Sequence, residues 1–251
     1  MRIAVLSDIH ANLHALQAVW EDVSRLNVDN VYCLGDLVGY GAYPNEVVAF
    51  VQENRIHTVM GNYDEAVGYD MRQSGTLSRT DDEDRLDRLT LGWTRRETSM
   101  EGKTYLQSLP ISRRERHRMM SMVFVHGSPR RMDEYLYPDL PLATFQAMAR
   151  LADSDVVFMG HTHLPLVRRV DGTWFVNPGS VGMPRDGNPQ ASYAVFSRGL
   201  RTDIEIRRVT YDVDAAIDAV TGAGLPDELA TWLTAGLAPK KVSGLKGEIA
   251  E

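Results

Sequence analysis

Short runs of hydrophobic residues alternate with segments of helical periodicity through the first third of the chain. The runs at residues 3–6, 31–34 and 57–60 are typical of buried strands. Between them, hydrophobic residues recur at helical spacing over 13–26, and Pro44 with Asn45 marks the start of a second helix. This βαβαβ order predicts a parallel sheet with right-handed crossovers, in which functional groups gather in the loops beyond the carboxyl ends of the strands.

The second half of the chain is richer in strand patterns. Strands are expected at 122–125 and 155–159, with a helix at 142–152 between them. Four more short strands, separated by turns rich in Gly and Pro, are expected at 166–170, 174–176, 192–196 and 204–209. Such turns are typical of antiparallel pairing.

A polar segment from about 65 to 118 interrupts this order and is expected to be a helical insertion. Thr80 to Glu83 has the spacing of a capping box, so the acidic run there predicts the solvated start of a helix. The alternative, a calcium site, lacks the Gly and the spaced oxygen ligands of an EF-hand loop. After Asp212 we expect two short helices and a loose tail at 239–244. The domains predicted are therefore 1–210, with the insertion, and a helical extension with tail over 211–251.

The composition is that of an ordinary globular protein, with 251 residues of which 43% are hydrophobic and 24% charged. Its net charge of −7 opposes a general attraction to nucleic-acid phosphates or anionic lipid. No run approaches the roughly 18 apolar residues of a membrane span. Cys33 is the single cysteine, which excludes an intrachain disulfide and favours a reducing compartment. We expect a cytoplasmic protein.

Polar residues of the types that bind metal ions follow five of the predicted strands. In order, they are Asp8-Ile9-His10, Gly35-Asp36, Gly61-Asn62, His126-Gly127 and Gly160-His161-Thr162-His163. Taken singly, each is an ordinary turn or capping sequence. Turn chemistry does not call for His, however, and four of the 7 histidines lie in these turns. Together they predict a metal site with oxygen and nitrogen ligands.

These five motifs, with Asp64 and Val125 included in the third and fourth, resemble the ordered motifs of the calcineurin-like metallophosphoesterases. The resemblance spans residues 1 to about 210, and Asn177-Pro178-Gly179-Ser180 resembles the small bacterial and archaeal phosphodiesterase branch. It implies an α/β fold of two facing β-sheets sandwiched by helices, a four-layer αββα arrangement. It also implies a dinuclear metal centre.

Carried over position by position, the resemblance implies two sets of metal ligands. One metal would be held by Asp8, His10, Asp36 and His163, and the other by Asp36, Asn62, His126 and His161. Asp36 would bridge two ions, and a bridging hydroxide would be the nucleophile. Ions roughly 3.5–4 Å apart can stabilise both the attacking and the leaving oxygen of a phosphoryl displacement. These ligand types favour two divalent ions, manganese first, with iron, nickel, zinc or magnesium as alternatives.

Two departures from the family pattern bear on the chemistry predicted for Asn62, Tyr63 and Asp64, the expected catalytic motif. The family often has His at the position of Tyr63, where it can protonate a leaving oxygen. A phenol, with a reference pKa near 10 against about 6.5 for imidazole, is the poorer donor. We therefore expect a preference for good leaving groups.

The second departure follows Asp36, where the superfamily's phosphoprotein phosphatases carry Asp-Arg-Gly. Here Leu37-Val38 leads into Gly39-Tyr40-Gly41, so that arginine is absent. A monoester dianion gains more from a bidentate guanidinium than a diester monoanion does, which favours phosphodiesters. Arg185 and Arg130 are candidates to bind the substrate phosphate. Tyr40 is a candidate to stack on a nucleoside, with loop packing as the alternative.

The sequence therefore predicts a dinuclear metal-dependent phosphohydrolase, with a phosphodiesterase of small phosphorylated molecules favoured. The alternatives are a phosphomonoesterase and a non-catalytic scaffold or partner-binding module on the same fold, like the retromer subunit that it resembles. The complete ligand set disfavours the scaffold. Net acidic charge disfavours a nuclease and other nucleic-acid partners. No membrane partner is expected, and no pattern indicates an oligomeric state.

Overall fold

The computed structural model describes residues 1–77 and 80–236. Its first sheet has the strand order β10-β9-β1-β2-β3, and β1, β2 and β3 are parallel, which confirms the predicted βαβαβ series. β9 joins the other side of β1 in antiparallel orientation. The strands are β1 (Arg2–Leu6), β2 (Asn30–Cys33), β3 (His57–Thr58), β9 (Ala191–Arg198) and β10 (Thr202–Val209).

The second sheet has the order β4-β5-β6-β8-β7. Its inner strands β5, β6 and β8 are parallel, and an antiparallel strand closes each edge. The predicted antiparallel pairing is confirmed for β7 with β8 and for β9 with β10. The strands are β4 (Ser112–His117), β5 (Met120–Val125), β6 (Val156–Phe158), β7 (Leu166–Val170) and β8 (Thr173–Asn177).

The two sheets face each other across an aromatic core. Tyr32 of β2 stacks on Phe124 of β5 at a ring distance of 4.2 Å, and Phe124 stacks on Phe158 of β6 at 4.8 Å. Phe196 of β9 meets Phe158 edge-on at 5.5 Å. Burying side chains of this size contributes about 1.5–3 kcal/mol each. The core therefore fixes the two sheets, and the ends of their strands, relative to each other.

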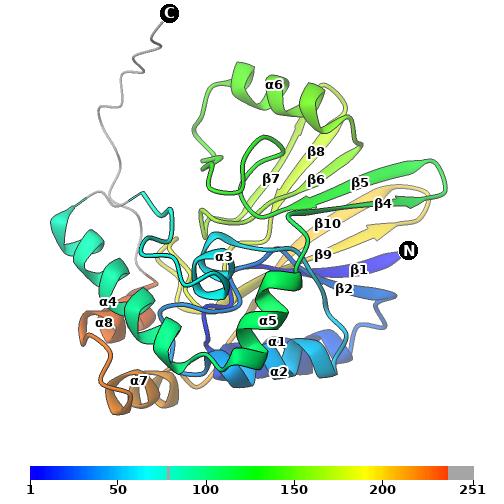
Figure 1. Ribbon diagram of the computed structural model, residues 1–251. Coiled ribbons are helices and arrows are strands. Elements are labelled where there is room, and N and C mark those ends of the chain that lie inside the picture. Colours follow the sequence, from blue (N-terminus) through cyan, green and yellow to red (C-terminus); the bar gives the residue numbers. More distant parts are fainter. Residues whose placement is uncertain (78–79, 237–251) are drawn as a thin grey trace, which may run out of the picture.

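Helices cover the outer faces of both sheets. α1 (Leu13–Ser24) and α2 (Pro44–Glu53) lie against the first sheet, and α6 (Leu142–Ala152) lies against the second (Figure 1). α1 begins at the predicted position because the side chain of Asn12 accepts the Ala15 N–H at 3.1 Å. Two mixed sheets flanked by helices confirm the expected fold class.

The inserted segment begins within α3 (Asn62–Gly68) and contains α4 (Asp81–Glu97) and α5 (Met100–Ser108). The predicted cap is present, because Thr80 Oγ1 accepts the Glu83 N–H at 3.1 Å. The helical part ends at Ser108, however, and 112–117 is strand β4 rather than the end of a helical insertion at 118. Its exposed and half-buried residues alternate with the two-residue period of a strand. Four of its six residues are charged, so this period does not appear in the pattern of hydrophobic residues.

The chain returns to the first sheet's helical layer through α7 (Val213–Gly222) and α8 (Glu228–Ala235), which confirms two helices after Asp212. The Trp93 indole of α4 donates to the Ala223 carbonyl at 3.1 Å, so the inserted and C-terminal helices are in contact (Figure 1). The tail predicted at 239–244 lies outside the described residues. Within the described ranges, no helix combines the length and the apolar character needed to cross a bilayer.

Candidate metal centre

The turns after five strands, three in the first sheet and two in the second, meet at one end of the molecule. Backbone hydrogen bonds tie them together: Asp8 N–H to Gly35 O at 3.0 Å, His10 N–H to Asp36 O at 2.9 Å, and Gly160 N–H to His126 O at 2.6 Å. The structure thereby brings together all seven side chains predicted as metal ligands, each 0–4% exposed. They are Asp8, His10, Asp36, Asn62, His126, His161 and His163.

The carboxylates and imidazoles form two groups of three, Asp8–His10–His163 and Asp36–His126–His161. Within each group the candidate ligand atoms lie within 4.8 Å of one another. In the first, Nε2 of His10 is 3.1 Å from Nε2 of His163. In the second, Nε2 of His126 is 3.1 Å from Nδ1 of His161. Two imidazole lone pairs at this separation repel each other unless a cation or a proton lies between them.

Asp36 stands between the two groups. Its Oδ2 atom is 3.7 Å from His10 Nε2 and 3.4 Å from His126 Nε2. The other oxygen, Oδ1, accepts the backbone N–H of Tyr63 at 2.9 Å, which fixes the rotation of the carboxylate. One oxygen therefore faces both groups of ligands, as a carboxylate shared by two cations requires.

Hydrogen bonds on the far side of three imidazoles orient their Nε2 atoms toward the centre. The Nδ1 atoms of His10, His126 and His163 lie 3.1, 2.8 and 2.6 Å from the carbonyls of Val38, Leu34 and Met183. A carbonyl accepts only from N–H, so Nδ1 carries the proton and Nε2 is left as the ligand atom in the neutral ring. His161 is the exception, since its Nδ1 faces the centre.

The Asn62 amide is oriented in the same way. Its Nδ2 donates to the Ser74 carbonyl at 2.9 Å and to Thr76 Oγ1 at 3.3 Å. Its Oδ1 consequently faces the centre, 2.8 Å from His126 Nε2. An amide oxygen in this position could serve the second group as a fourth ligand.

Asp8 supplies a direct sign that a cation fits here. Its Oδ2 atom accepts from Ser7 Oγ at 2.5 Å and from the His161 N–H at 3.1 Å. Its Oδ1 atom is buried and has no hydrogen-bond partner among the described residues. A buried carboxylate oxygen without a partner is costly, and a divalent cation between Asp8, His10 and His163 would satisfy it.

Five of the ligands adopt backbone angles that side chains normally avoid. Asp8, His10, Asp36, His161 and His163 have φ between +48° and +65°. Each such residue costs about 1–2 kcal/mol relative to the right-handed region.

The turns are also tightly packed, because a Cβ atom on Gly61 would lie 2.2 Å from Asp36 Oδ1. The glycines of the motifs therefore allow the close approach of loops that carry the ligands.

Burial and mutual charge determine the protonation of the metal-free centre. Burial lowers the pKa of His10 to about 4 and that of His161 to about 3. Burial also acts to lower the pKa of His126, but the Asp36 carboxylate outweighs it and raises that pKa to about 9. The pKa of Asp36 is correspondingly lowered, since His126 outweighs the opposing effect of burial. At neutral pH, the proton on His126 thus occupies the place that a cation would take.

A pocket over this centre is lined by two of the predicted substrate-binding residues, Tyr40 and Arg185. The Arg185 guanidinium lies 6.0 Å from the Tyr40 ring and 5.6 Å from the Trp232 ring of α8. Arg130, the third candidate, pairs instead with Glu134 and is 55% exposed. It does not line the pocket.

The remaining members of the expected catalytic motif have partners of their own. The Tyr63 phenol donates to Asp87 of α4, and burial raises its pKa well above the ordinary value. The Asp64 carboxylate accepts the backbone N–H groups of Gly61 and Leu37 at 3.0 and 2.8 Å. Asp64 thus holds the turns after β2 and β3 together, while Asn62 alone of the three presents a ligand atom.

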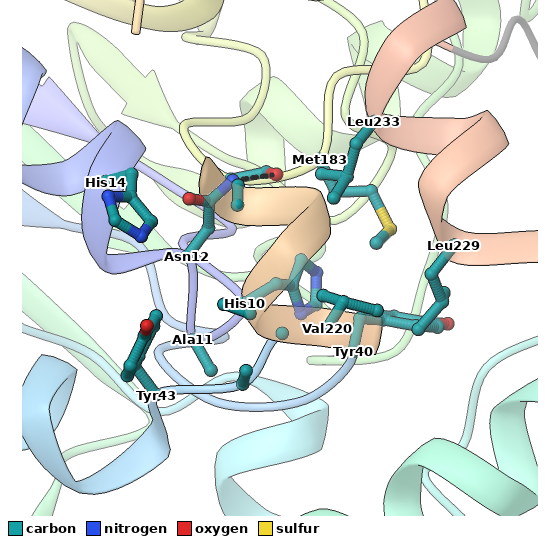
Figure 2. Close-up of a pocket in the computed structure, with 15 residues that line it drawn as sticks. His10, Ala11, Asn12, His14, Tyr40, Tyr43, Met183, Val220, Leu229 and Leu233 are labelled. Carbon is teal, nitrogen blue, oxygen red and sulfur yellow. Dashed lines mark hydrogen bonds between the residues drawn. The ribbon is translucent and has the colours of Figure 1, made fainter. Parts of the chain in front are cut away.

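Figure 2 shows a second, largely apolar pocket, which shares His10 and Tyr40 with the pocket over the metal centre. Val220 of α7 and Leu229 and Leu233 of α8 line it. The C-terminal helices therefore line a pocket that includes a predicted metal ligand. Nothing in the sequence pattern of these helices indicates that position.

Several residues that support the site were not assigned a role by sequence. Asn177 Nδ2 donates to the Gly160 carbonyl at 2.8 Å, and Ser180 Oγ donates to the Asp8 carbonyl at 2.7 Å. Both belong to the Asn-Pro-Gly-Ser motif, which is the feature of the sequence that could have identified them. The Tyr135 ring lies 3.8 Å from the His161 ring at an interplanar angle of 32°, and it comes from a loop without a recognisable motif.

Comparison with known proteins identifies the class of this fold and site. The family model of the calcineurin-like phosphoesterase superfamily domain matches residues 1–198. The chain belongs to this superfamily, which confirms the resemblance seen in its motifs.

The chain is similar to several proteins over nearly its whole length. An uncharacterized protein of Methanocaldococcus jannaschii is 34% identical over 251 residues, covering 93% of this chain and 98% of that protein. A metallophosphoesterase structure from Sphaerobacter thermophilus has a TM-score of 0.78 at 34% identity, covering 94% of this chain and 100% of its own. A hypothetical protein from Pyrococcus horikoshii has a TM-score of 0.83 at 25% identity, covering 95% and 99%.

A shorter similarity concerns a phosphodiesterase. The Escherichia coli protein YfcE is 35% identical over 68 residues, which make up 27% of this chain and 36% of that protein.

Metal binding should release the proton held by His126. At pH 7 we expect His126 to contribute about one released proton per molecule as the centre fills, whereas His10 and His161, which are already neutral, contribute none. Total release should fall by about one proton per molecule as the pH passes about 9. Calorimetric titration with Mn²⁺, in buffers that differ in protonation enthalpy, measures this number. Release that stays constant across that pH range would contradict the assignment.

Proposed function

We propose that this protein is a dinuclear metal-dependent phosphodiesterase that hydrolyses a small phosphorylated molecule in the cytoplasm, with manganese as its metal. The observation that supports this most directly is the position of Asp36, whose Oδ2 atom faces two buried groups of ligands at once. Asp8, His10, His163 and Asp36 would hold one ion. Asp36, Asn62, His126 and His161 would hold the other.

The donor set suits this assignment. It consists of neutral imidazoles, carboxylates and one amide oxygen, without thiolate, which favours metals such as manganese over softer ions. When bound, a pair of such ions supplies an activated nucleophile and neutralises charge on the phosphoryl oxygens. The buried, pre-oriented side chains hold this arrangement without reorganisation during turnover.

Arg185 is the group in this chain that we assign to binding the substrate phosphate. It is half-buried and lines the pocket over the metal centre together with His161 and His163. No carboxylate within the described ranges forms an ion pair with it, so its donors can bind an anion. The rings of Tyr40 and Trp232 limit where the guanidinium lies.

Two observations favour diesters over monoesters. The arginine that phosphoprotein phosphatases carry beyond the bridging Asp is absent, which leaves Arg185 as the cation lining the pocket. A diester monoanion has less charge to neutralise than a monoester dianion. The local similarity to phosphodiesterase YfcE points to the same substrate class.

Hydrolysis of bis-p-nitrophenyl phosphate should depend on the metal centre. Chelation should abolish it, and Asp36→Asn should lower kcat/KM by at least about 100-fold, since loss of the shared ligand removes several kcal/mol of charge stabilisation. Asp203→Asn, on an exposed position of β10, is the matched control and should retain activity. Activity that survives both chelation and Asp36→Asn would refute the proposal.

Substitutions of two arginines distinguish a specific role in substrate binding from a general effect of surface charge. Arg185→Met should lower kcat/KM for the same diester by about 10- to 100-fold, because one charge-assisted hydrogen bond contributes about 1.5–3 kcal/mol. Arg130→Met removes an equal charge outside the pocket and should have no comparable effect. Steady-state kinetics of both variants test the assignment, and equal losses would contradict it.

The Tyr63 phenol should not serve as the general acid, because its proton is donated to Asp87. Tyr63→His should therefore raise kcat/KM for a phenyl diester, relative to a p-nitrophenyl diester, by about 10-fold or more. Tyr63→Phe should leave the ratio between the two substrates unchanged. A ratio that falls in Tyr63→Phe, or does not rise in Tyr63→His, would show that the phenol already supplies the proton.

A further inference from the structure

Helix α4 reaches toward the metal centre through one buried carboxylate, that of Asp87. Its side chain lies inside the protein, with the residue only 6% exposed, whereas the acidic residues at the start of the helix are exposed or half-buried. None of the motifs that define the metal ligands includes Asp87. A buried carboxylate needs hydrogen-bond donors, and the donors it has identify what it does.

The partners of Asp87 are Ser74 and Tyr63. Ser74 Oγ lies 2.8 Å from Asp87 Oδ1 and 3.0 Å from Oδ2, and the Tyr63 phenol donates to Oδ1. Ser74 belongs to the segment between α3 and α4, and Tyr63 belongs to α3 itself. The carboxylate therefore connects α4 to α3 and to the segment between these two helices.

Ser74 leads directly to a predicted metal ligand. Its backbone carbonyl accepts from Asn62 Nδ2 at 2.9 Å, and its hydroxyl oxygen accepts the Thr76 N–H at 3.1 Å. Thr76 Oγ1 in turn accepts from Asn62 Nδ2 at 3.3 Å. The Asn62 amide N–H₂ therefore has two acceptors, the Ser74 carbonyl and Thr76 Oγ1. Ser74 is hydrogen-bonded to Asp87 directly, and Thr76 is connected to Asp87 through Ser74.

We infer that Asp87 is a positioning residue for the second metal site: through Ser74 it holds the acceptors that turn the Asn62 amide oxygen toward His126. This inference rests on the proposed metal centre. An amide rotated by half a turn would present N–H₂, which cannot bind a cation. The acceptors at Ser74 and Thr76 prevent that rotation, and Asp87 fixes the segment that carries them.

The chemistry of a carboxylate suits this task better than that of its neutral analogue. Ionised Asp87 offers only acceptor atoms, so it can receive the Ser74 and Tyr63 hydroxyls at the same time. An Asn in its place has one acceptor and would turn an N–H₂ group toward one of the two hydroxyls. The helix itself is held in place by the hydrogen bond from Trp93 to Ala223.

The test compares Mn²⁺ binding by calorimetry in the wild-type protein, Asp87→Ala, Asp87→Asn and the control Asp84→Asn. Asp84 lies on the same helix, is solvent-exposed at its side chain and pairs with Arg88. We expect Asp87→Ala to weaken one of two Mn²⁺ sites by about 10- to 100-fold, the usual effect of removing an outer hydrogen-bond partner, and to spare the other. Asp87→Asn should have a smaller effect on the same site, and Asp84→Asn none.

A double-mutant cycle separates positioning from a general loss of structure. In the Asn62→Ala background, Asp87→Asn should cause no further loss of Mn²⁺ affinity, because its effect passes through the amide that is already gone. Additive losses, equal weakening of both sites, or unchanged affinity in both Asp87 variants would each overturn the inference. A wild-type protein that binds no Mn²⁺ would instead refute the proposed metal centre itself.

Discussion

The convergence of seven buried polar side chains on one small volume is the constraint on which this structure depends. Imidazole nitrogens approach to 3.1 Å in each of two groups, and the Oδ1 atom of Asp8 is buried without a hydrogen-bond partner among the described residues. Folding has to remove these groups from water and hold them against mutual repulsion. A centre of this kind is stable only in a rigid framework, and cations bound within it would relieve the cost.

That framework is the pair of facing sheets. The stacked rings of Tyr32, Phe124 and Phe158 fix the sheets relative to each other, and the ligands follow directly at the ends of strands from both. The energy gained in this core offsets the left-handed backbone of residues such as Asp36 and His163. Relaxing the backbone of these turns to ordinary φ angles would move the buried side chains away from one another. The strain is therefore a consequence of bringing these side chains together.

The sequence predicted much of the fold, and the structure brings the seven predicted ligands together, because strand ends and metal-binding residue types are local patterns. His10 and His163 are 153 positions apart, yet each is recognisable from its own turn. What it could not predict were contacts between segments without motifs. The strand at 112–117 was hidden by its arginines, and the roles of Asp87, Tyr135 and Trp232 depend on which loops and helices meet. The sequence does not mark such residues, because their roles depend on contacts that exist only in the folded structure.

The packing of α7 and α8 around a pocket that His10 also lines has a consequence for where the functional unit of this chain ends. These helices lie beyond the region that the family model matches, at residues 1–198, and yet they supply Trp232 beside Arg185 and the apolar wall shown in Figure 2. The superfamily domain and the helices that follow it therefore share one site. Substitutions in two helices outside the matched region can change the surroundings of Arg185 without altering the turns that carry the seven buried side chains.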